Sequence, residues 1–372
     1  MTSSRSVTIV QEYVPAYRAP LFREMKVLAK ARGIDLRIAA GTPQGTQAQR
    51  GDTSDFSPDI RVGEQKWSVL GRRLSWRSLG SVYRDSDLVI LEQARRNIDT
   101  HLALRHPKHK VALWGHGRDH TRDVSQRDAK LLADMTARAH WFFGYTTASV
   151  DHVVETGFPR ERTTVLNNTT DTASLSATLA DETLVSVAAT RARLGLGANV
   201  ATFIGALDDS KRLDFLLDAA DLVARDVPDF TLVVAGDGPL RDWIDQQTGT
   251  RPWLRRVGRL VGKDLASCLA VSDIIAMPGR VGLLAVDALA AGVPIVTTDW
   301  PFHAPERAYL TANNSVTTAN TAAAYANGIT ALLADRQRRD GLASCGRQDS
   351  VDLTIEKMAQ RFVEGIEHAL DA

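Results

Sequence analysis

A glycine-bearing turn lies between two short apolar runs in the second half of the sequence. Residues 274–277 are apolar, Pro278 and Gly279 interrupt them, and residues 283–291 have helical composition before the β-branched run at 295–298. This order predicts a strand, a tight turn, a helix and a second strand.

The start of that predicted helix has the properties of a phosphate-binding site. The backbone N–H groups of Val281, Gly282 and Leu283 would lie at the helix N-terminus, where unpaired donors and the helix dipole favour anions. Asp287 follows about one turn later and is placed to accept hydrogen bonds from a ribose. The motif is short by itself, and an Asp287 that merely caps the helix or is solvated is the alternative.

Three residues of the first half are suited to contact a ligand. His116 lies between two glycines just after the predicted strand at 111–114, and an imidazole titrates near neutral pH. Tyr17 and Arg18 lie in the loop after the first predicted strand, at 7–10. Ligands of open α/β sheets bind beyond the carboxyl ends of the strands, so all three are candidate contacts. The alternatives are a packed Tyr17, a solvated Arg18 and a His116 without a special role.

Strand and helix patterns alternate along both halves. Strands are predicted at residues 7–10, 34–39, 88–91, 111–114, 141–145, 163–166, 200–204, 231–235, 257–260, 274–277 and 295–298. A polar run at 167–180 has no periodicity, which places a domain boundary near 172–190. We therefore predict an α/β protein with two Rossmann-like parallel-sheet domains, residues 1–175 and 185–350, and a final amphipathic helix within 355–372.

Charge is distributed unevenly along the chain. Residues 1–171 contain 26 Lys and Arg against 19 Asp and Glu, giving +7, whereas residues 172–372 contain 19 against 25, giving −6. A basic first half predicts an anionic partner. Nucleic acid is not expected, because the basic residues are scattered and no nucleic-acid-binding motif is present. A lipid phosphate or an anionic membrane surface fits the charge as well.

Residues 66–77 alternate two tryptophans and several apolar residues with basic ones. Interfacial segments pair Trp with Lys and Arg, so a peripheral contact with a membrane or a lipid acceptor is one interpretation. A strand and a loop with solvated charges is the other. The chain has no apolar stretch of about 18 residues and no signal-peptide pattern at its start, so we expect a cytoplasmic protein, with the inner face of the membrane as its place of contact.

Motifs of the second half point to a known family. They are the Phe203-Ile204-Gly205 strand end followed by Lys211, the Gly236-Asp237-Gly238-Pro239 turn, Val257-Gly258-Arg259-Leu260, and the Asn168-Thr169-Thr170-Asp171 end of the first domain. Together they resemble the GT-B glycosyltransferases, in particular the retaining family-4 enzymes that use nucleotide-activated sugars. The resemblance covers nearly the whole chain, is strongest over residues 202–294, and implies a GT-B fold in which the two domains face a cleft.

The resemblance implies roles for individual residues. Lys211 would bind the donor diphosphate and, with His116 near the donor sugar, act as a catalytic residue. Tyr17 and Arg18 would bind the acceptor in the first domain. The implied donor-binding residues are Gly205, Lys211, Arg212, Gly236, Val257, Arg259, Arg280, Val281, Gly282, Leu283 and Asp287.

Two positions depart from the family pattern. The family has a glutamate eight residues before its second acid, and Gly279 occupies that place ahead of Asp287. An arginine that usually follows the glycine of the first motif is Ala206 here. Donor-sugar recognition is therefore expected to differ, and the remaining cationic candidates for phosphate are Lys211, with Arg212, Arg280 or Arg18.

We expect a glycosyltransferase that moves a sugar from a UDP- or GDP-linked donor to a glycan or lipid-linked acceptor, with retention of anomeric configuration. Positive charge from Lys211 and the helix N-terminus can stabilise the leaving diphosphate, and no acidic cluster has metal-ligand spacing, so no metal or other cofactor is expected. The alternatives are a catalytically silent nucleotide-sugar-binding partner, which the absent glutamate favours, or another GT-B enzyme such as a nucleotide-sugar epimerase.

Overall fold

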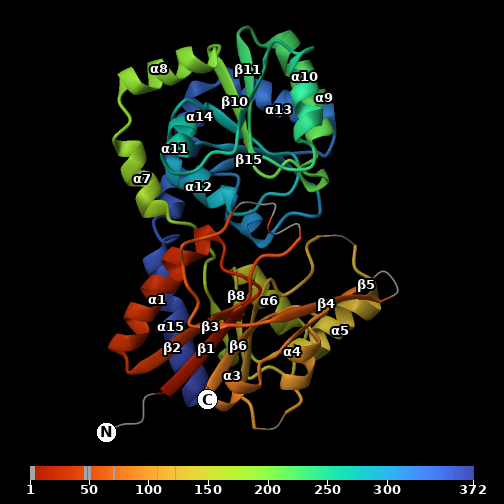
Figure 1. Ribbon diagram of the computed structural model, residues 1–372. Coiled ribbons are helices and arrows are strands. Elements are labelled where there is room, and N and C mark those ends of the chain that lie inside the picture. Colours follow the sequence, from red (N-terminus) through yellow and green to blue (C-terminus); the bar gives the residue numbers. More distant parts are fainter. Residues whose placement is uncertain (1–4, 46–47, 49–51, 70–71, 107, 122) are drawn as a thin grey trace. The chain divides into compact units, whose positions relative to one another are not determined.

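The computed structural model describes residues 5–45, 48, 52–69, 72–106, 108–121 and 123–372, and the chain divides into two compact units. The first unit comprises Met1–Asn168 and Ile355–Ala372, and the second comprises Thr169–Thr354. Each unit is a parallel sheet with helices on both faces (Figure 1). The predicted α/β class with two Rossmann-like domains is confirmed. The division itself lies shortly before the boundary predicted near 172–190.

The first unit is built on a parallel sheet in the order β3-β2-β1-β6-β7-β8-β9. Its strands are β1 (Arg5–Gln11), β2 (Ile34–Ala40), β3 (Ile60–Arg61), β6 (Leu88–Glu92), β7 (Val111–Gly115), β8 (Trp141–Gly144) and β9 (Thr163–Val165). Its helices are η1 (Ala16–Arg18), α1 (Ala19–Ala31), α3 (Gly80–Arg84), α4 (Ile98–Ala103), α5 (Gln126–Thr136), α6 (Thr147–Glu155), η2 (Arg160–Arg162) and α15 (Ile355–Asp371). Chain order reverses direction between β1 and β6, and ligands of such sheets bind at that switch point.

Alternation of side chains along the strands divides the core of the first unit into two layers. Ile9 and Ile90 pack with Phe22 of α1 and Phe362 of α15 on one face. On the other face, Leu91 and its neighbours pack against buried residues of α3, α5 and α6. The C-terminal helix α15 therefore contributes to the core of the unit that begins the chain, as Figure 1 shows by its blue ribbon beside α1.

The segment that alternates Trp with basic residues forms an antiparallel hairpin of β4 (Glu64–Val69) and β5 (Arg72–Arg77). Trp67 is exposed, but Lys66 and Arg77 are engaged in ion pairs inside the unit. Both cations are therefore neutralised by neighbouring carboxylates. They are neither solvated nor available to an anionic surface, and membrane contact by this segment stays a prediction that would rest on its other residues.

The second unit has a parallel sheet in the order β12-β11-β10-β13-β14-β15. Its strands are β10 (Asn199–Ile204), β11 (Phe230–Ala235), β12 (Leu254–Gly258), β13 (Ile274–Ala276), β14 (Ile295–Thr298) and β15 (Ser315–Thr318). Its helices are α7 (Thr172–Ala180), α8 (Leu184–Leu194), η3 (Asp209–Lys211), α9 (Leu213–Asp226), α10 (Arg241–Thr248), α11 (Gly262–Ala270), α12 (Leu284–Ala291), η4 (Pro305–Tyr309), α13 (Ala322–Ala334) and α14 (Arg336–Ser350). Here the switch point lies between β10 and β13.

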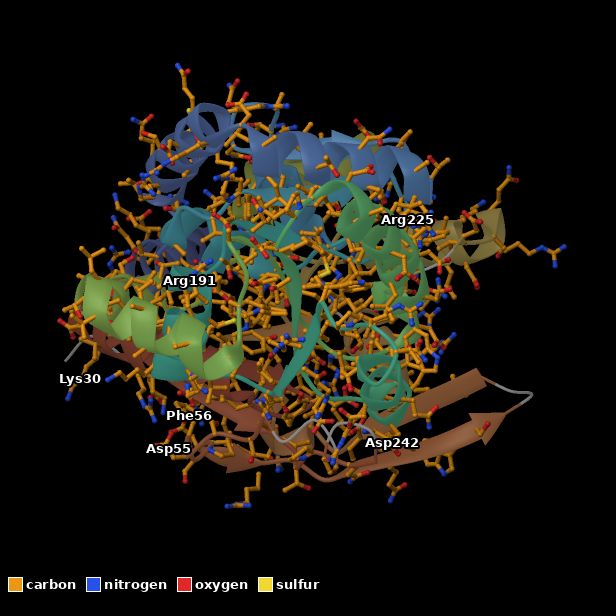
Figure 2. The ribbon with its side chains drawn as sticks, turned by 90° about the horizontal axis from the view of Figure 1, so that it is seen from above. Lys30, Asp55, Phe56, Arg191, Arg225 and Asp242 are labelled. Atoms are coloured by element: carbon orange, nitrogen blue, oxygen red, sulfur yellow. The ribbon has the colours of Figure 1, made fainter. Side chains whose placement is uncertain are left out.

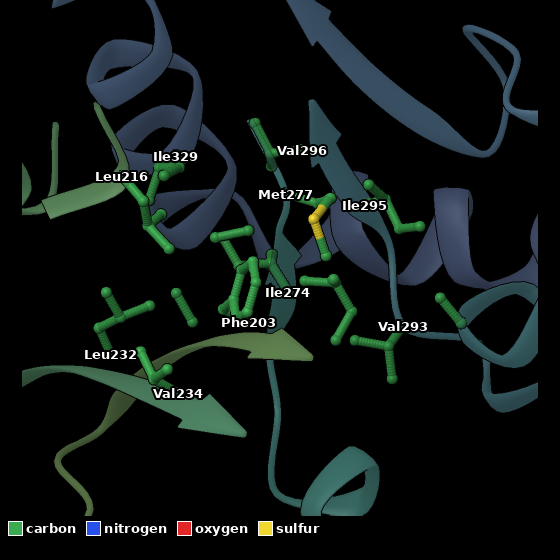
Figure 3. Packing of buried hydrophobic residues seen from close by; sticks show 14 of the residues in the cluster. Phe203, Leu216, Leu232, Val234, Ile274, Met277, Val293, Ile295, Val296 and Ile329 are labelled. Atoms are coloured by element: carbon green, nitrogen blue, oxygen red, sulfur yellow. The ribbon is translucent and has the colours of Figure 1, made fainter. Parts of the chain in front are cut away.

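Phe203 of β10 lies in the middle of the second unit's core (Figure 3). Ile274 of the adjacent strand β13, Ile295 of β14 and Leu216 of α9 pack in the same cluster. α9 packs against α13, while α12 packs against α7 and α14. The shortest strand of this sheet, β13, is thus fully enclosed, which fixes the position of the turn that follows it.

Most of the polar run at 167–180, whose sequence has no periodicity, forms the helix α7. Asp171 accepts a hydrogen bond from the Ser174 N–H and begins α7, and α8 follows after a capping box at Thr183. Strand β12 also begins earlier than predicted, at Leu254, and ends at Gly258. Both helices were missed because they are rich in small and polar residues and have only weak apolar periodicity. Their N-terminal caps, by contrast, are strong.

Charged side chains extend from the surface of the second unit, for example Arg225 of α9 and Asp242 of α10 (Figure 2). Of the helices that the structure describes, none has both the length and the apolar composition needed to span a bilayer.

The contact between α15 and the first sheet predicts a stability effect. Phe362 stacks on Phe143, with ring centroids 4.6 Å apart, and meets Trp114 edge-on at 5.0 Å. Replacing a buried Phe by Ala costs about 3–5 kcal/mol through lost burial and a cavity. We expect Phe362→Ala to lower the free energy of unfolding by that amount in urea titrations, while Gln360→Ala on the exposed face of α15 changes it by less than about 0.5 kcal/mol.

Candidate functional site

The switch point of the second unit is formed by two turns that follow neighbouring strands. Gly205 comes directly after β10, and Pro278 and Gly279 follow β13. β10 is also paired with β11, whose end leads into Gly236. Three backbone turns therefore converge at the carboxyl edge of this sheet, where a ligand of an open α/β sheet is expected.

Glycine is required where two of these turns touch. A Cβ atom added to Gly236 would lie 1.8 Å from the Gly205 carbonyl oxygen, and the φ of Gly236 is +153°. The Gly236 N–H donates to the carbonyl of Gly258 at the end of β12, at 2.7 Å. The predicted glycines thus bring the ends of β10, β11 and β12 together, which no larger residue would permit.

Gly279 packs directly against the backbone of η3. A Cβ atom at this position would lie 2.5 Å from the Lys211 carbonyl carbon and 2.6 Å from the Ser210 oxygen. The next residue also joins the two loops, because the Arg280 N–H donates a hydrogen bond to the Ser210 carbonyl at 2.9 Å. A side chain at position 279 has no space, so the absence of a glutamate there follows from how closely these two loops approach.

Lys211 lies between the two turns of the switch point. Its side chain packs over Gly205, and its ammonium group donates to the Arg280 carbonyl. Burial lowers the pKa of Lys211 to about 8, with opposing contributions from Asp208 and Glu306. The ammonium is therefore still largely protonated at neutral pH, and a bound anion would raise its pKa again.

The turn before α12 supplies backbone donors, although fewer than predicted. Within the described residues, the N–H groups of Gly282 and Leu283 have no acceptor, as expected for a helix N-terminus. The N–H of Val281 was expected to be a further unpaired donor, and this is wrong. It donates to Nδ1 of His303 at 3.1 Å.

His303 is the residue that sequence reasoning missed. Its Nε2 lies 3.0 Å from the Thr298 carbonyl, which can only accept, so Nε2 carries the proton and Nδ1 accepts from Val281. Burial lowers the pKa of His303 to about 4, and the ring stays neutral at physiological pH. The sequence shows this histidine only as part of an aromatic and proline-rich run after β14. That pattern does not indicate that His303 accepts from the Val281 N–H.

Glu306 is a second residue that the sequence did not single out. It lies in the first turn of η4 and is buried, with 4% of its surface exposed. Its Oε2 would be 4.0 Å from a Cβ added to Gly282, and its charge raises the pKa of Lys211. The segment reaches this place because the Ala304 N–H donates to the Val281 carbonyl at 2.9 Å. Glu306 therefore lies beside the turn that begins α12.

Asp287 lies in the first turn of α12, as predicted. Its Oδ1 accepts a hydrogen bond from the Thr170 hydroxyl at 2.6 Å. Burial raises the pKa of Asp287 to about 6, while the Thr170 hydrogen bond acts in the opposite direction. The carboxylate is thus ionised at neutral pH, with its second oxygen as a further acceptor.

The remaining predicted donor-site residues lie farther along the same edge. Val257 is near the end of β12 and Arg259 follows it, exposed. Arg212 begins α9 with a φ of +55°, and its guanidinium lies over the Phe215 ring and donates to Asn320. Arg212 therefore has a structural role in addition to any contact with phosphate.

In the first unit, His116 is displayed by a turn that Gln93 holds. Gln93 accepts from the Gly117 N–H at 2.9 Å, and Gly117 has a φ of +79° with the Ser149 carbonyl 2.5 Å from the position of a Cβ. The His116 ring lies 4.7 Å from that of Tyr145, centroid to centroid. The turn thus presents the imidazole beyond the carboxyl end of β7.

Arg18 is buried rather than solvated, with 3% of its surface exposed. It donates to the Asn168 side chain at 2.8 Å, and its guanidinium lies 4.9 Å from the Trp114 ring and 5.0 Å from the Tyr17 ring. Tyr17 itself is 41% exposed. Both predicted acceptor residues lie in η1, directly before α1, and Arg18 has structural partners as well.

The structure brings together Gly205, Lys211, Gly236, Arg280, Gly282, Leu283 and Asp287 within the second unit, while His116, Tyr17 and Arg18 belong to the first. Across the residues described, no group of three or more His, Cys, Asp or Glu side chains has the arrangement of a metal site.

Residues 198–335 match the family model of the glycosyl transferases group 1. The matched segment begins just before β10 and contains every residue of the second-unit site except Thr170.

Curated relatives match over a minor part of the chain. The D-inositol 3-phosphate glycosyltransferase of Jonesia denitrificans is 34% identical over 127 residues, 30% of this chain and 30% of the relative. The glycogen synthase of Mycobacterium tuberculosis is 32% identical over 103 residues, 26% of this chain and 25% of the relative. The chain matches under a third of the length of either relative.

Likeness in fold extends over both units. The structure of Anabaena Alr3699/HepE in complex with UDP has a TM-score of 0.67 and covers 98% of this chain and 99% of that one, at 17% identity. The predicted GT-B class of fold is therefore confirmed.

His303 bridges the Val281 N–H and the Thr298 carbonyl, and removing its side chain should lower the stability of the protein. Alanine at this position leaves the Val281 N–H and the Thr298 carbonyl without partners, and each unsatisfied buried group costs about 1–3 kcal/mol. We expect His303→Ala to lower the free energy of unfolding accordingly in urea titrations. His303→Gln, whose amide keeps a donor and an acceptor, should lose less.

The same bridge predicts a pH dependence of stability. The folded pKa of about 4 lies below the ordinary 6.5, so the unfolded chain binds the proton more readily in that window. The wild-type protein should lose stability as the pH falls from 6.5 towards 4, and the slope should be smaller in His303→Ala. An equal slope in both proteins would contradict a buried, neutral His303.

Proposed function

We propose that this protein is a glycosyltransferase that uses a nucleotide-sugar donor. The observation that carries the proposal is the cationic, glycine-lined switch point of the second unit, inside the segment matched by the glycosyl transferases group 1 model. There, Lys211 lies over Gly205, and the N–H groups of Gly282 and Leu283 at the start of α12 have no acceptor in the described part of the chain. The donor-binding role of the second unit and the acceptor-binding role of the first follow from this assignment.

The chemistry needs a site that stabilises a leaving diphosphate. Lys211 supplies a positive charge, and the N–H groups of Gly282 and Leu283 supply hydrogen bonds in line with the α12 dipole. Preorganised donors of this kind are worth roughly 3–4 kcal/mol each in a transition state. These groups are sufficient without a metal ion, and we propose metal-independent transfer with retention of anomeric configuration, the acceptor attacking on the face from which the diphosphate leaves.

Recognition of the nucleotide is proposed for two places. The free oxygen of Asp287 would accept a hydrogen bond from the ribose, and the backbone near Val257 and Arg259 would contact the base. The crystal structure of Alr3699/HepE, which has a similar fold, contains UDP, and this supports a uridine nucleotide. A GDP-linked donor is the alternative, since a GDP-mannose-dependent mannosyltransferase of Mycolicibacterium smegmatis is 27% identical over 176 residues.

The first unit is proposed to bind a glycan or lipid-linked acceptor. His116 is held beyond β7 on a rigid turn, and Tyr17 is exposed in η1, directly before α1. We assign His116 a catalytic role near the transferred sugar and Tyr17, with Arg18 behind it, a role in binding the acceptor. The excess of positive charge in residues 1–171 supports a place at the cytoplasmic face of an anionic membrane.

Release of nucleoside diphosphate tests the function. The protein is incubated with UDP-, GDP- and TDP-sugars in the presence of EDTA, with and without glycan acceptors. We expect turnover of one nucleotide class, unaffected by the chelator. Lys211→Ala should lower kcat by about 100-fold or more through the loss of one transition-state contact. Lys263→Ala, an exposed lysine of α11, is the control and should be active.

Two outcomes would reject this assignment. Undiminished turnover by Lys211→Ala would remove the diphosphate role. If no donor is turned over while one of them still raises the melting temperature, the protein is instead a silent nucleotide-sugar-binding partner.

A bell-shaped pH profile follows from the two shifted groups. Asp287 must be ionised to accept from a ribose, and its pKa is raised to about 6. Lys211 must be protonated to bind phosphate, and its pKa is lowered to about 8. The kcat/KM for the donor should therefore fall below about pH 6 and above about pH 8. Asp287→Asn should abolish the acid limb, and a profile that is flat between pH 5 and 9 would contradict both assignments.

A further inference from the structure

The switch point of the first unit has carboxylates where that of the second has glycines and a cation. β1 and β6 are neighbouring parallel strands, and the chain order reverses between them. Glu12 follows the last residue of β1, and Glu92 is the last residue of β6. The two carboxylates therefore lie at the place where a parallel sheet of this topology binds its ligand.

The hairpin of β4 and β5 holds one of these carboxylates in place. Lys66 of β4 donates to Oε1 of Glu12 at 2.7 Å and lies 2.8 Å from Oε2 of Glu64. The Lys66 side chain is 16% exposed and that of Glu12 is 30% exposed. One cation is thus shared between two acids, and Glu12 remains accessible at the sheet edge.

Arg77 of β5 is the second cation near these carboxylates. It is 2% exposed and donates twice to the Asp99 carboxylate, from Nη2 at 2.8 Å and from Nε at 3.2 Å. Its remaining Nη1 is buried, and among the described residues it has no hydrogen-bond partner. That atom is directed at Oε2 of Glu92, 3.8 Å away, which is beyond hydrogen-bonding distance.

Glu92 is consequently held by charge but not saturated by hydrogen bonds. The nearest donor found in the described part of the chain is the Glu12 N–H, at 3.5 Å from Oε1. A third of the Glu92 side chain is exposed, at 33%. A carboxylate accepts about four hydrogen bonds, so Glu92 offers acceptor capacity that the protein itself does not use.

We propose that Glu92, together with Glu12, forms a binding site for the hydroxyl groups of an uncharged sugar, and that this sugar is the terminal unit of the acceptor. The assignment of this sugar to the acceptor rests on the proposed function. The chemical class of the ligand rests only on the geometry of the first unit. His116 follows the next strand, β7, which pairs with β6, so the site and the predicted catalytic histidine share one sheet edge.

The charge of the surroundings selects against an anion. Within the described residues, the ion pairs around the site join Glu12 after β1, Glu64 and Lys66 on β4, Arg77 on β5, Glu92 on β6 and Asp99 on α4, which are four acids against two cations. A phosphate or a uronate would meet like charges at close range. Sugar hydroxyls are donors that a carboxylate pair can bind, so the local chemistry differs from what the net charge of the first half predicts.

The site should respond to pH in a defined direction. Burial raises the pKa of Glu92 to about 7, with Arg77 opposing that shift and Glu12 adding to it. Glu92 gains acceptor capacity when it loses its proton. Affinity for an uncharged sugar should therefore increase as the pH rises from 6 to 8.

Direct binding tests the chemical class without any assumption about catalysis. Calorimetric titrations of the full chain use a panel of neutral trisaccharides and matched trisaccharides in which one unit is a uronic acid. We expect at least one neutral sugar to bind and its uronic-acid counterpart to bind at least about tenfold more weakly. Glu92→Gln should weaken neutral binding about tenfold and remove its pH dependence, since a charge-assisted hydrogen bond is lost. Glu161→Gln, an exposed acid of η2, should change neither.

Three results would overturn the proposal. They are equal affinity for neutral and anionic sugars, equal affinity of the wild type and Glu92→Gln for a neutral sugar, and no binding of any neutral sugar. Kinetics separates this failure from failure of the proposed function. In Glu92→Gln, the KM for a neutral acceptor should rise while acceptor-independent hydrolysis of the nucleotide sugar is unchanged. Absence of donor turnover in the wild type would reject the transferase and leave the sugar-binding result standing.

Discussion

The carboxyl edge of the second sheet depends on one close contact between two loops. The backbone at Gly279 lies directly against Ser210 and Lys211, with the Arg280 N–H bonded to the Ser210 carbonyl. That approach sets the Lys211 ammonium over Gly205 and excludes any side chain at position 279. A glutamate at position 279 would therefore clash with the backbone of Ser210 and Lys211. His303 supports the far side of the same turn by bonding Val281.

The two sheets have the same kind of switch point, but the groups found there have opposite charge. Both sheets reverse chain order beside their first strand, and both place polar groups at that reversal. In the second unit these are a lysine and backbone N–H groups, which suit phosphate, whereas in the first they are Glu12 and Glu92, which suit hydroxyls. The net charges of +7 and −6 along the sequence run the other way. Net charge describes a surface, and a binding site is decided by a few residues that are removed from water.

Much of the fold was predictable because strands and helices of parallel sheets carry a strong apolar pattern. The alternation of elements, the two domains and the turns at Gly236 and Gly279 followed from it. The helices after Asp171 were missed because caps rather than apolar spacing define them. The candidate phosphate-binding turn was located correctly, but which of its N–H groups are free was not, since His303 approaches from about twenty residues farther along the chain.

Sequence patterns predicted the class of fold, the position of the glycine turns and Lys211 and Asp287 as candidate residues, because local propensity and spacing act over a few residues. Tertiary structure alone decided the protonation and the partners of these groups. Burial sets the pKa values of Lys211 and Asp287, and the reversal between β1 and β6 brings Glu12 next to Glu92 across about eighty residues of chain. Desolvation and long-range pairing depend on what lies nearby in space, and one-dimensional spacing does not contain that information.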